Sequence, residues 1–288
     1  MRVGEGQYIY EWIDNWVTLP DTELGRKDKA HHGIVVTESG LVLMFHEGGP
    51  AILAYDTDGN LQGEWESGLT NAHGMTLVQE DGTEYLLMAD NKSGQVVKTT
   101  LHGEVVLNIE CPEIPIYREG RYAPTWAAAS EERYGGNGDI WVADGYGESY
   151  VHRYDKHGKY ITSITGEEGN IGRFDQPHGI WIGNRRNELE LYISDRVNGR
   201  VQVYDTDGNY KRVFGSEFFN KRSPSGFLSL GELMLVLELR SRLSLVDSDD
   251  DLVCYIGDNS PVINADNWPD VAESLIKKGR FNSPHSAA

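Results

Sequence analysis

Short apolar runs separated by turn residues are the dominant pattern along this chain. In the segment that begins at Gly33, alternating residues lead into a glycine turn, and a second apolar run follows at Leu41–Phe45. Short alternating runs bounded by Gly, Asn and Asp are typical of β-strands. The sequence therefore predicts an all-β fold, and it allows one short helix, within a loop at residues 270–278.

An aspartate-rich turn recurs after the third strand of each predicted unit. Its copies are Tyr55-Asp56-Thr57-Asp58-Gly59-Asn60, Tyr154-Asp155-Lys156-His157-Gly158-Lys159, Tyr204-Asp205-Thr206-Asp207-Gly208-Asn209 and the degraded Val246-Asp247-Ser248-Asp249-Asp250. Asp-Gly between apolar runs indicates a β-hairpin, and it predicts a type I′ turn, in which both central residues have positive φ.

A second phrase recurs just before the first strand of each unit. Its copies are His31-His32-Gly33, Ala72-His73-Gly74, Pro124-Thr125-Trp126, Pro177-His178-Gly179, Pro224-Ser225-Gly226 and Pro284-His285-Ser286. A spacing of roughly 40–60 residues is typical of propellers. If each phrase opens the innermost strand of a blade, its variable residue faces the central axis.

Four strands per unit predict one six-bladed β-propeller domain over residues 1–288, with five complete blades and an incomplete sixth. The expected blades are 32–66, 73–109, 124–166, 178–215 and 225–257, and the sixth combines 284–288 with a strand at 8–13. The middle strands of the sixth blade are missing. Truncation, a vestigial blade and completion by another protomer each explain this, and an open ring favours self-association.

Composition excludes some classes of partner and location. The formal net charge of −19 argues against nucleic-acid partners and anionic membrane surfaces. Cys111 and Cys254 lie far apart, outside any CxxC pattern, and are expected to be buried free thiols. The first residues contain no signal peptide and no run spans a bilayer, so the expected location is the cytoplasm.

Histidines at the recurring phrase are the candidate metal ligands. His73, His178 and His285 occupy equivalent positions, and His32 is a further candidate. A single histidine at this position is more often structural. Several histidines directed at one axis instead favour a site for zinc or another divalent transition metal, because three imidazoles with an open position form catalytic zinc sites. The other histidines of note, His102, His152 and His157, are interpreted as structural.

The ends of the second strands carry a further set of polar residues that should line the mouth of the same channel. Asp90, Asp144 and Asp195 are expected to accept hydrogen bonds from turn amides. Tyr146 and Arg196 have no such role. Arg196 can pair with a substrate anion and Tyr146 can move a proton, while a structural Arg–Tyr stacking contact is the alternative.

The repeats resemble the NHL propeller family. From residue 72 onward the chain also resembles the zinc-dependent peptidyl-α-hydroxyglycine α-amidating lyases, through the segments Val142-Ala143-Asp144-Gly145-Tyr146 and Ser194-Asp195-Arg196-Val197-Asn198-Gly199-Arg200-Val201-Gln202. This resemblance implies that His73, His178 and His285 bind zinc, that Tyr146 transfers a proton and that Arg196 helps to hold the substrate. It also implies breakage of a C–N bond in an α-hydroxyglycine.

The chain departs from that family at three points. Glu47 stands where the family has an arginine that serves the substrate carboxylate, and Ser286 stands where it has an acidic calcium ligand. The family's secretory setting and disulfides also have no counterpart here. A carboxylate accepts hydroxyl hydrogen bonds, so Glu47 suits a sugar-derived hemiacetal or a hydroxy acid better than a peptide carboxylate.

Three functional hypotheses follow. The first is a metal-dependent lyase or hydrolase that acts on a small hydroxylated substrate, with His32 and Glu47 as additional site residues. The second is a non-catalytic NHL propeller that serves as an interaction platform. The third is a calcium-dependent lactonase-type hydrolase, for which Glu47, Asn91 and Glu238 are the candidate ligands.

Overall fold

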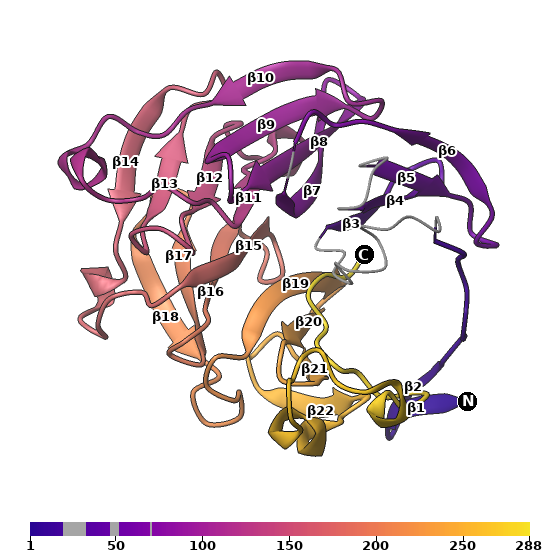
Figure 1. Ribbon diagram of the computed structural model, residues 1–288. Coiled ribbons are helices and arrows are strands. Elements are labelled where there is room, and N and C mark those ends of the chain that lie inside the picture. Colours follow the sequence, from indigo (N-terminus) through magenta and orange to yellow (C-terminus); the bar gives the residue numbers. More distant parts are fainter. Residues whose placement is uncertain (20–32, 47–51, 70) are drawn as a thin grey trace.

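The computed structural model describes residues 1–19, 33–46, 52–69 and 71–288, so the candidates His32 and Glu47 lie outside the described residues. Twenty of its strands form five four-stranded antiparallel sheets, arranged as the blades of a ring (Figure 1). The prediction of an all-β propeller with five complete blades is confirmed.

Each blade runs from an inner to an outer strand in chain order. The blades are β3 (Ile34–Val36), β4 (Val42–Phe45), β5 (Ile52–Tyr55) and β6 (Leu61–Trp65); β7 (Ala72–Glu80), β8 (Thr83–Asp90), β9 (Gln95–Thr100) and β10 (Val105–Ile109); β11 (Trp126–Ala129), β12 (Ile140–Ala143), β13 (Val151–Tyr154) and β14 (Tyr160–Ile164); β15 (Pro177–Gly183), β16 (Glu190–Asp195), β17 (Arg200–Asp205) and β18 (Tyr210–Phe214); and β19 (Pro224–Leu230), β20 (Leu233–Glu238), β21 (Arg242–Val246) and β22 (Leu252–Ile256).

The helices of the described residues are short 3-10 turns in the connections. They are η1 (Pro115–Arg118), η2 (Glu132–Tyr134), η3 (Glu167–Gly169), η4 (Ser260–Asn264) and η5 (Glu273–Leu275). The helix allowed at residues 270–278 is therefore only the single turn η5, in which the Leu275 amide donates to the Ala272 carbonyl. Nucleating a longer helix costs more than so short a segment regains.

The aspartate turns differ from the predicted type I′ geometry. In the first copy, positive φ occurs at Gly59 but not at Asp58. The Asp56 carboxylate accepts hydrogen bonds from the amides of Asp58 and Asn60, and the strand register shifts between Ala54 and Tyr55. The aspartate side chain thus stabilises a longer turn, with glycine at a bulge position, and the type I′ prediction is wrong.

Alternation of side chains along the strands builds the core between neighbouring blades. Trp141 of the third blade and Tyr204 of the fourth belong to one cluster and are fully buried. A second cluster joins the fourth and fifth blades through Tyr192 and Met234, both also fully buried. Because each sheet packs face to face on the next, the blades hold their inner strands in a fixed arrangement around the axis.

The N-terminal segment lies in the sector between the fifth and first blades. The strand expected at residues 8–13 is present as β2 (Tyr8–Glu11), but it pairs with β1 (Arg2–Glu5) in a separate two-stranded sheet. Val3 and Tyr8 pack against the fifth blade. Trp16 packs against the first blade, and its indole N–H donates to the Thr57 carbonyl over 3.1 Å.

The C-terminal segment at 284–288 forms no strand, although it runs toward the middle of the ring (Figure 1). The described residues therefore contain no four-stranded sixth blade.

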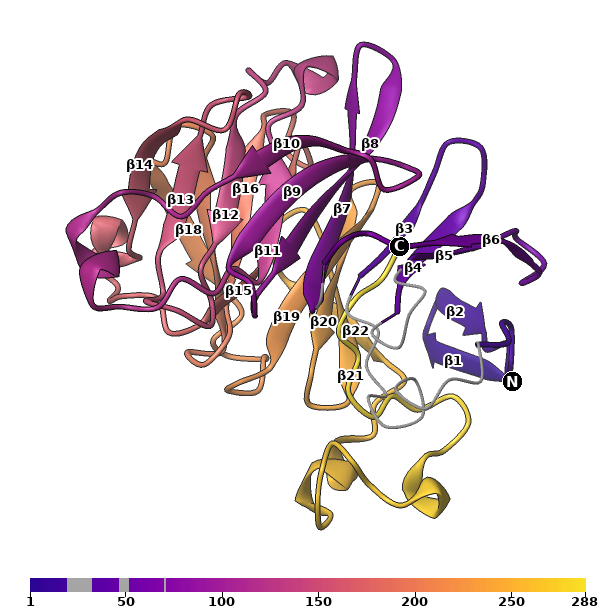
Figure 2. The ribbon, with the colours of Figure 1, turned by 45° about the horizontal axis from the view of Figure 1, so that its top comes forward.

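The antiparallel order of strands divides the loops between two rims of the ring (Figure 2). Each inner strand begins at one rim, and the turn between the second and third strands returns to that same rim. The aspartate turns between the third and fourth strands lie on the opposite rim. The histidine positions and the loops that carry Tyr146 and Arg196 consequently share one end of the channel.

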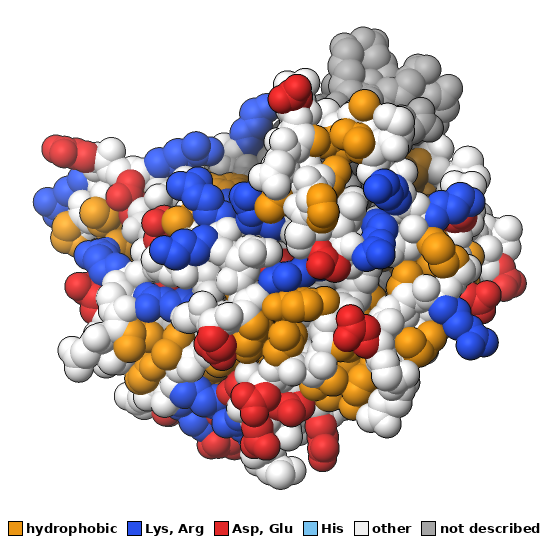
Figure 3. All heavy atoms as spheres, turned by 90° about the horizontal axis from the view of Figure 1, so that it is seen from below, with side chains coloured by type: hydrophobic (Ala, Val, Ile, Leu, Met, Phe, Trp, Pro, Cys, Tyr) orange, Lys and Arg blue, Asp and Glu red, His pale blue; other side chains and the backbone are white. Residues whose placement is uncertain are grey.

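The molecular surface carries interspersed charges. On the face shown in Figure 3, acidic side chains gather along the border opposite the grey residues. Both cysteines are free thiols; Cys254 is buried, while Cys111 is only half-buried, contrary to expectation. Within the described part of the chain, no helix has the length and apolar character needed to cross a membrane.

Candidate metal centre at the channel axis

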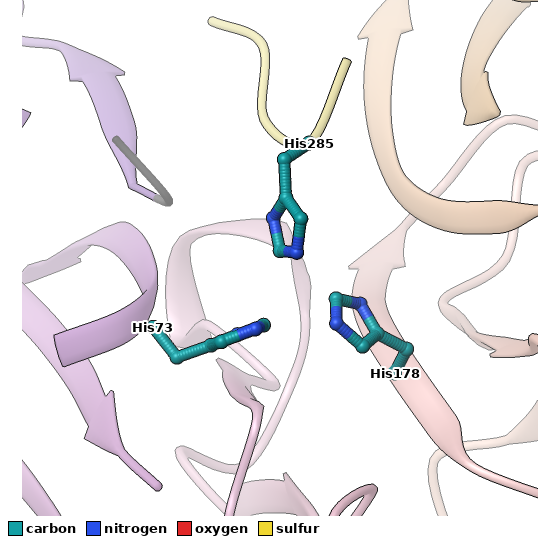
Figure 4. Close-up of side chains that lie close together, drawn as sticks. All are labelled: His73, His178 and His285. Atoms are coloured by element: carbon teal, nitrogen blue, oxygen red, sulfur yellow. The ribbon is translucent and has the colours of Figure 1, made fainter. Parts of the chain in front are cut away.

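Three imidazoles from three separate parts of the chain converge on the axis (Figure 4). His73 is near the start of β7, His178 is near the start of β15, and His285 belongs to the C-terminal segment. Their candidate ligand atoms all lie within 4.8 Å of one another. Among the described residues this is the single group of three or more His, Cys, Asp or Glu side chains close enough to hold one metal ion.

Backbone carbonyls of the following inner strands orient two of these rings. His73 Nδ1 lies 3.0 Å from the Thr125 carbonyl oxygen, and His178 Nδ1 lies 2.8 Å from the Ser225 carbonyl oxygen. A carbonyl can only accept, so each Nδ1 carries the hydrogen. In the neutral ring the Nε2 lone pair then faces the axis, the orientation that a metal-ligating histidine requires.

The glycines that follow His73 and His178 permit this close approach. A Cβ on Gly74 would lie 2.5 Å from the Thr125 carbonyl oxygen, and one on Gly179 would lie 2.3 Å from the Ser225 carbonyl oxygen. Any larger residue would push the next inner strand away from the histidine. The His-Gly pairs therefore place an imidazole on the axis and let the next blade support it.

Tyr146 lies over the histidine cluster. It is part of the loop between β12 and β13, and its Oη is 3.2 Å from Nε2 of both His73 and His178. Arg196 follows β16, and its Nη1 donates to Tyr146 Oη over 3.1 Å. The guanidinium carbon also lies 5.1 Å from the centre of the Tyr146 ring, which is the Arg–Tyr contact considered as the structural alternative.

Tyr146 Oη lies between two imidazoles and has one hydrogen of its own. The phenol has one hydrogen, which it can donate to His73 Nε2 or to His178 Nε2 but not to both at once, and Arg196 supplies its hydrogen to the phenol oxygen itself. A cation can be bound by both nitrogen lone pairs. The donor set of three imidazoles also matches catalytic zinc sites, so these residues fit a divalent transition metal.

Burial keeps His178 in its ligating form. The side chain is fully buried, and burial lowers its pKa well below the usual value. The positive charge of Arg196 and the other two imidazoles lower that pKa further. His178 is therefore neutral near pH 7, with a lone pair available to a metal.

The other polar residues at the strand ends serve the blades themselves. Asp144 accepts from the amides of Ala123 and Glu148, each over 2.7 Å, and thereby shapes the loop that carries Tyr146. Asp195 accepts from the Asp175 amide over 2.8 Å. These contacts match the expected role of the aspartates.

Glu238, a candidate calcium ligand of the third hypothesis, is fully buried inside the fifth blade. Its carboxylate accepts hydrogen bonds from Arg242, Ser223 and Ser244. These partners account for its charge without a cation.

Sequence reasoning missed the supporting residues of the site. Thr125 and Ser225 occupy the histidine position of their own blades, yet each holds the imidazole of an earlier blade through its carbonyl oxygen. Gln176 accepts from Arg196 Nη2 over 2.7 Å. The recurring phrase marked the positions of Thr125 and Ser225. Their role could not be predicted, however, because a backbone carbonyl oxygen is present in every residue type.

Comparisons with known proteins support the β-propeller fold. No family model matches the chain. Mouse peptidyl-glycine alpha-amidating monooxygenase is 34% identical over 74 residues, and rat peptidylglycine alpha-amidating monooxygenase is 31% identical over 74 residues. In each case the match covers 24% of this chain and 7% of the curated relative.

Solved propeller structures match much more of the chain. Virginiamycin B lyase from Staphylococcus aureus has a TM-score of 0.56 at 16% identity, covering 80% of this chain and 71% of that one. A streptogramin B lyase has 0.58 at 16%, covering 78% and 68%. A chain of the nidogen–laminin complex has 0.55 at 12%, covering 78% and 79%. At these identities the likeness shows the fold alone.

Proposed function

We propose that this chain is a metal-dependent lyase or hydrolase that acts on a small hydroxylated substrate. His73, His178 and His285 would hold zinc or a similar divalent transition metal. The observation that carries the proposal is the convergence of three imidazoles within 4.8 Å, two of them oriented by carbonyl oxygens. The 74-residue match to mouse peptidyl-glycine alpha-amidating monooxygenase supports an enzymatic role.

The residues around the cluster suit removal of a hydroxyl hydrogen. A bound divalent metal would supply Lewis acidity toward a substrate hydroxyl or a water. In a lyase reaction of this kind, the hydroxyl loses its proton, its C–O bond becomes a carbonyl, and the neighbouring bond breaks as the leaving atom gains a proton. Tyr146 would carry that proton, and Arg196 would position an anionic or hydroxylated group beside it.

Metal content is the first test. The protein is purified without added metal and subjected to elemental analysis beside His178→Ala and beside His157→Ala, which removes an exposed histidine in an aspartate turn. We expect about one zinc per chain in the wild type and in His157→Ala, and only traces in His178→Ala. Trace metal in the wild type would refute the proposal and favour the interaction platform.

A substrate screen then tests the chemistry. N-acyl-α-hydroxyglycines, 2-hydroxy acids and sugar hemiacetals are incubated with the metal-loaded protein, and carbonyl products are detected by derivatisation. Turnover that disappears in His178→Ala and persists in His157→Ala would support the proposal. If the metal-loaded wild type turns over no member of these classes, the proposed substrate class is wrong.

A further inference from the structure

An unusual backbone conformation marks the junction of three site elements. Gln176 directly precedes the Pro177-His178 phrase, and its φ is +58°. Ser149, on the loop that carries Tyr146, has a φ of +61°. This left-handed region is unfavourable for residues with a Cβ, and such residues persist where surrounding contacts require them.

Gln176 contacts both the loop that carries Tyr146 and the turn that carries Arg196. Its amide N–H donates to Ser149 Oγ over 3.3 Å, and its backbone carbonyl accepts from the Arg196 amide over 3.3 Å. Its side-chain Oε1 accepts from Arg196 Nη2 over 2.7 Å. One residue thus connects the loop of Tyr146 to the turn of Arg196, and the chain itself connects that residue to His178.

The Arg196 guanidinium is held at two points. Nη2 donates to Gln176 Oε1, while Nη1 donates to Tyr146 Oη over 3.1 Å. Two bonds from different nitrogens of a planar group define its orientation, whereas one bond leaves it free to swing. Removal of the Gln176 acceptor would therefore leave the guanidinium held by Tyr146 alone among these partners.

We propose that Gln176 is a positioning residue, which orients Arg196 so that its remaining N–H groups are directed toward a substrate bound beside Tyr146. The catalytic use of this arrangement rests on the proposed function. The orientation itself does not, and it can be measured without metal or substrate.

The test uses the full chain labelled with ¹⁵N-arginine. The guanidinium signal of Arg196 is assigned by its loss in Arg196→Lys and is compared among the wild type, Gln176→Leu and Gln176→Glu, the last of which keeps an acceptor. Gln79→Leu is the matched control, because Arg133 Nη1 donates to Gln79 Oε1 over 3.0 Å on the opposite rim.

We expect slow guanidinium rotation of Arg196 in the wild type, in Gln176→Glu and in Gln79→Leu, and fast or broadened exchange in Gln176→Leu. Zinc content should be the same in all four proteins. With a substrate from the screen, Gln176→Leu should lose roughly 10–100-fold in kcat/KM, the scale expected for a displaced catalytic group, and Gln176→Glu should retain more activity.

Unchanged Arg196 signals in Gln176→Leu would overturn the proposal. Loss of zinc in Gln176→Leu would also overturn it, since residue 176 would then act through His178. If the wild type binds no zinc, the proposed function fails, while the Arg196 signals still decide the role of Gln176.

Discussion

The contact between the fourth and fifth inner strands predicts that Gly179→Ala will damage both the fold and the metal site. An added Cβ would lie 2.3 Å from the Ser225 carbonyl oxygen and 2.6 Å from Gly226 Cα. Both atoms are backbone, so neither can rotate away. The strand β19 must retreat, and the His178 Nδ1 bond to the Ser225 carbonyl, 2.8 Å long, must lengthen with it.

The magnitude follows from two costs. Overpacking of a close-packed interior costs about 1–3 kcal/mol. Withdrawal of the buried Ser225 acceptor from His178 adds about 1–3 kcal/mol. We therefore expect the free energy of unfolding to fall by about 2–6 kcal/mol in total.

The assay is urea denaturation of the wild type, Gly179→Ala and the matched variant Gly226→Ala, together with thermal melts. Gly226 holds the same phrase position one blade on, but there the nearest atom to an added Cβ is the His285 carbonyl oxygen at 3.4 Å, an ordinary contact. Gly226→Ala should change stability by less than about 0.5 kcal/mol, whereas Gly179→Ala should lower Tm by roughly 3–10 °C. Equal stability of the two variants would refute the reasoning.

Three further outcomes follow from the structure. Tyr146→Phe should keep its zinc and lose about 100-fold or more in kcat on a substrate from the screen, so wild-type turnover by this variant would contradict the proton-transfer role. Zinc at about 100 times its Kd should raise the unfolding free energy of the wild type by about 2.7 kcal/mol, measured in melts with and without a chelator; an equal rise in His285→Ala would exclude His285 as a ligand. Burial lowers the pKa of His152 to about 3, whereas an unfolded histidine titrates near about 6.5. Between these values only the unfolded chain binds the proton, so stability falls with decreasing pH by up to about 1.4 kcal/mol per unit. Denaturant titrations should show that His152→Gln loses less unfolding free energy between pH 7 and pH 4 than the wild type does. If both proteins lose the same amount, His152 is not the cause of the pH dependence.

Strand periodicity made most of the fold predictable, because blades are local units whose strands pair with their sequence neighbours. The predicted second and fourth blades, for example, agree with β7–β10 and β15–β18 to within a residue at each end. The N-terminal hairpin was not predicted. Its strands pair locally, but they pack on the fifth blade through Val3 of β1 and Tyr8 of β2, and no local pattern encodes these contacts between residues far apart in the chain.

The residues of the candidate site that occupy repeated positions could be predicted from the sequence. His73, His178 and His285 stand at equivalent phrase positions, so the architecture alone brings them together. Gln176 occurs once, and its contact with Arg196 depends on a left-handed backbone that its residue type does not favour. Side chains in repeated positions were found from the sequence, whereas unique contacts required the structure.

The carbonyl supports of the histidines have a consequence for how such sites change. Thr125 and Ser225 hold their neighbours' imidazoles with main-chain oxygens, which every residue type possesses. Evolution or engineering can therefore replace the side chains at these two positions without removing the supports. The Thr125 side chain, in contrast, donates to the His178 carbonyl over 2.8 Å, so a donor introduced at that position must replace this hydrogen bond as well.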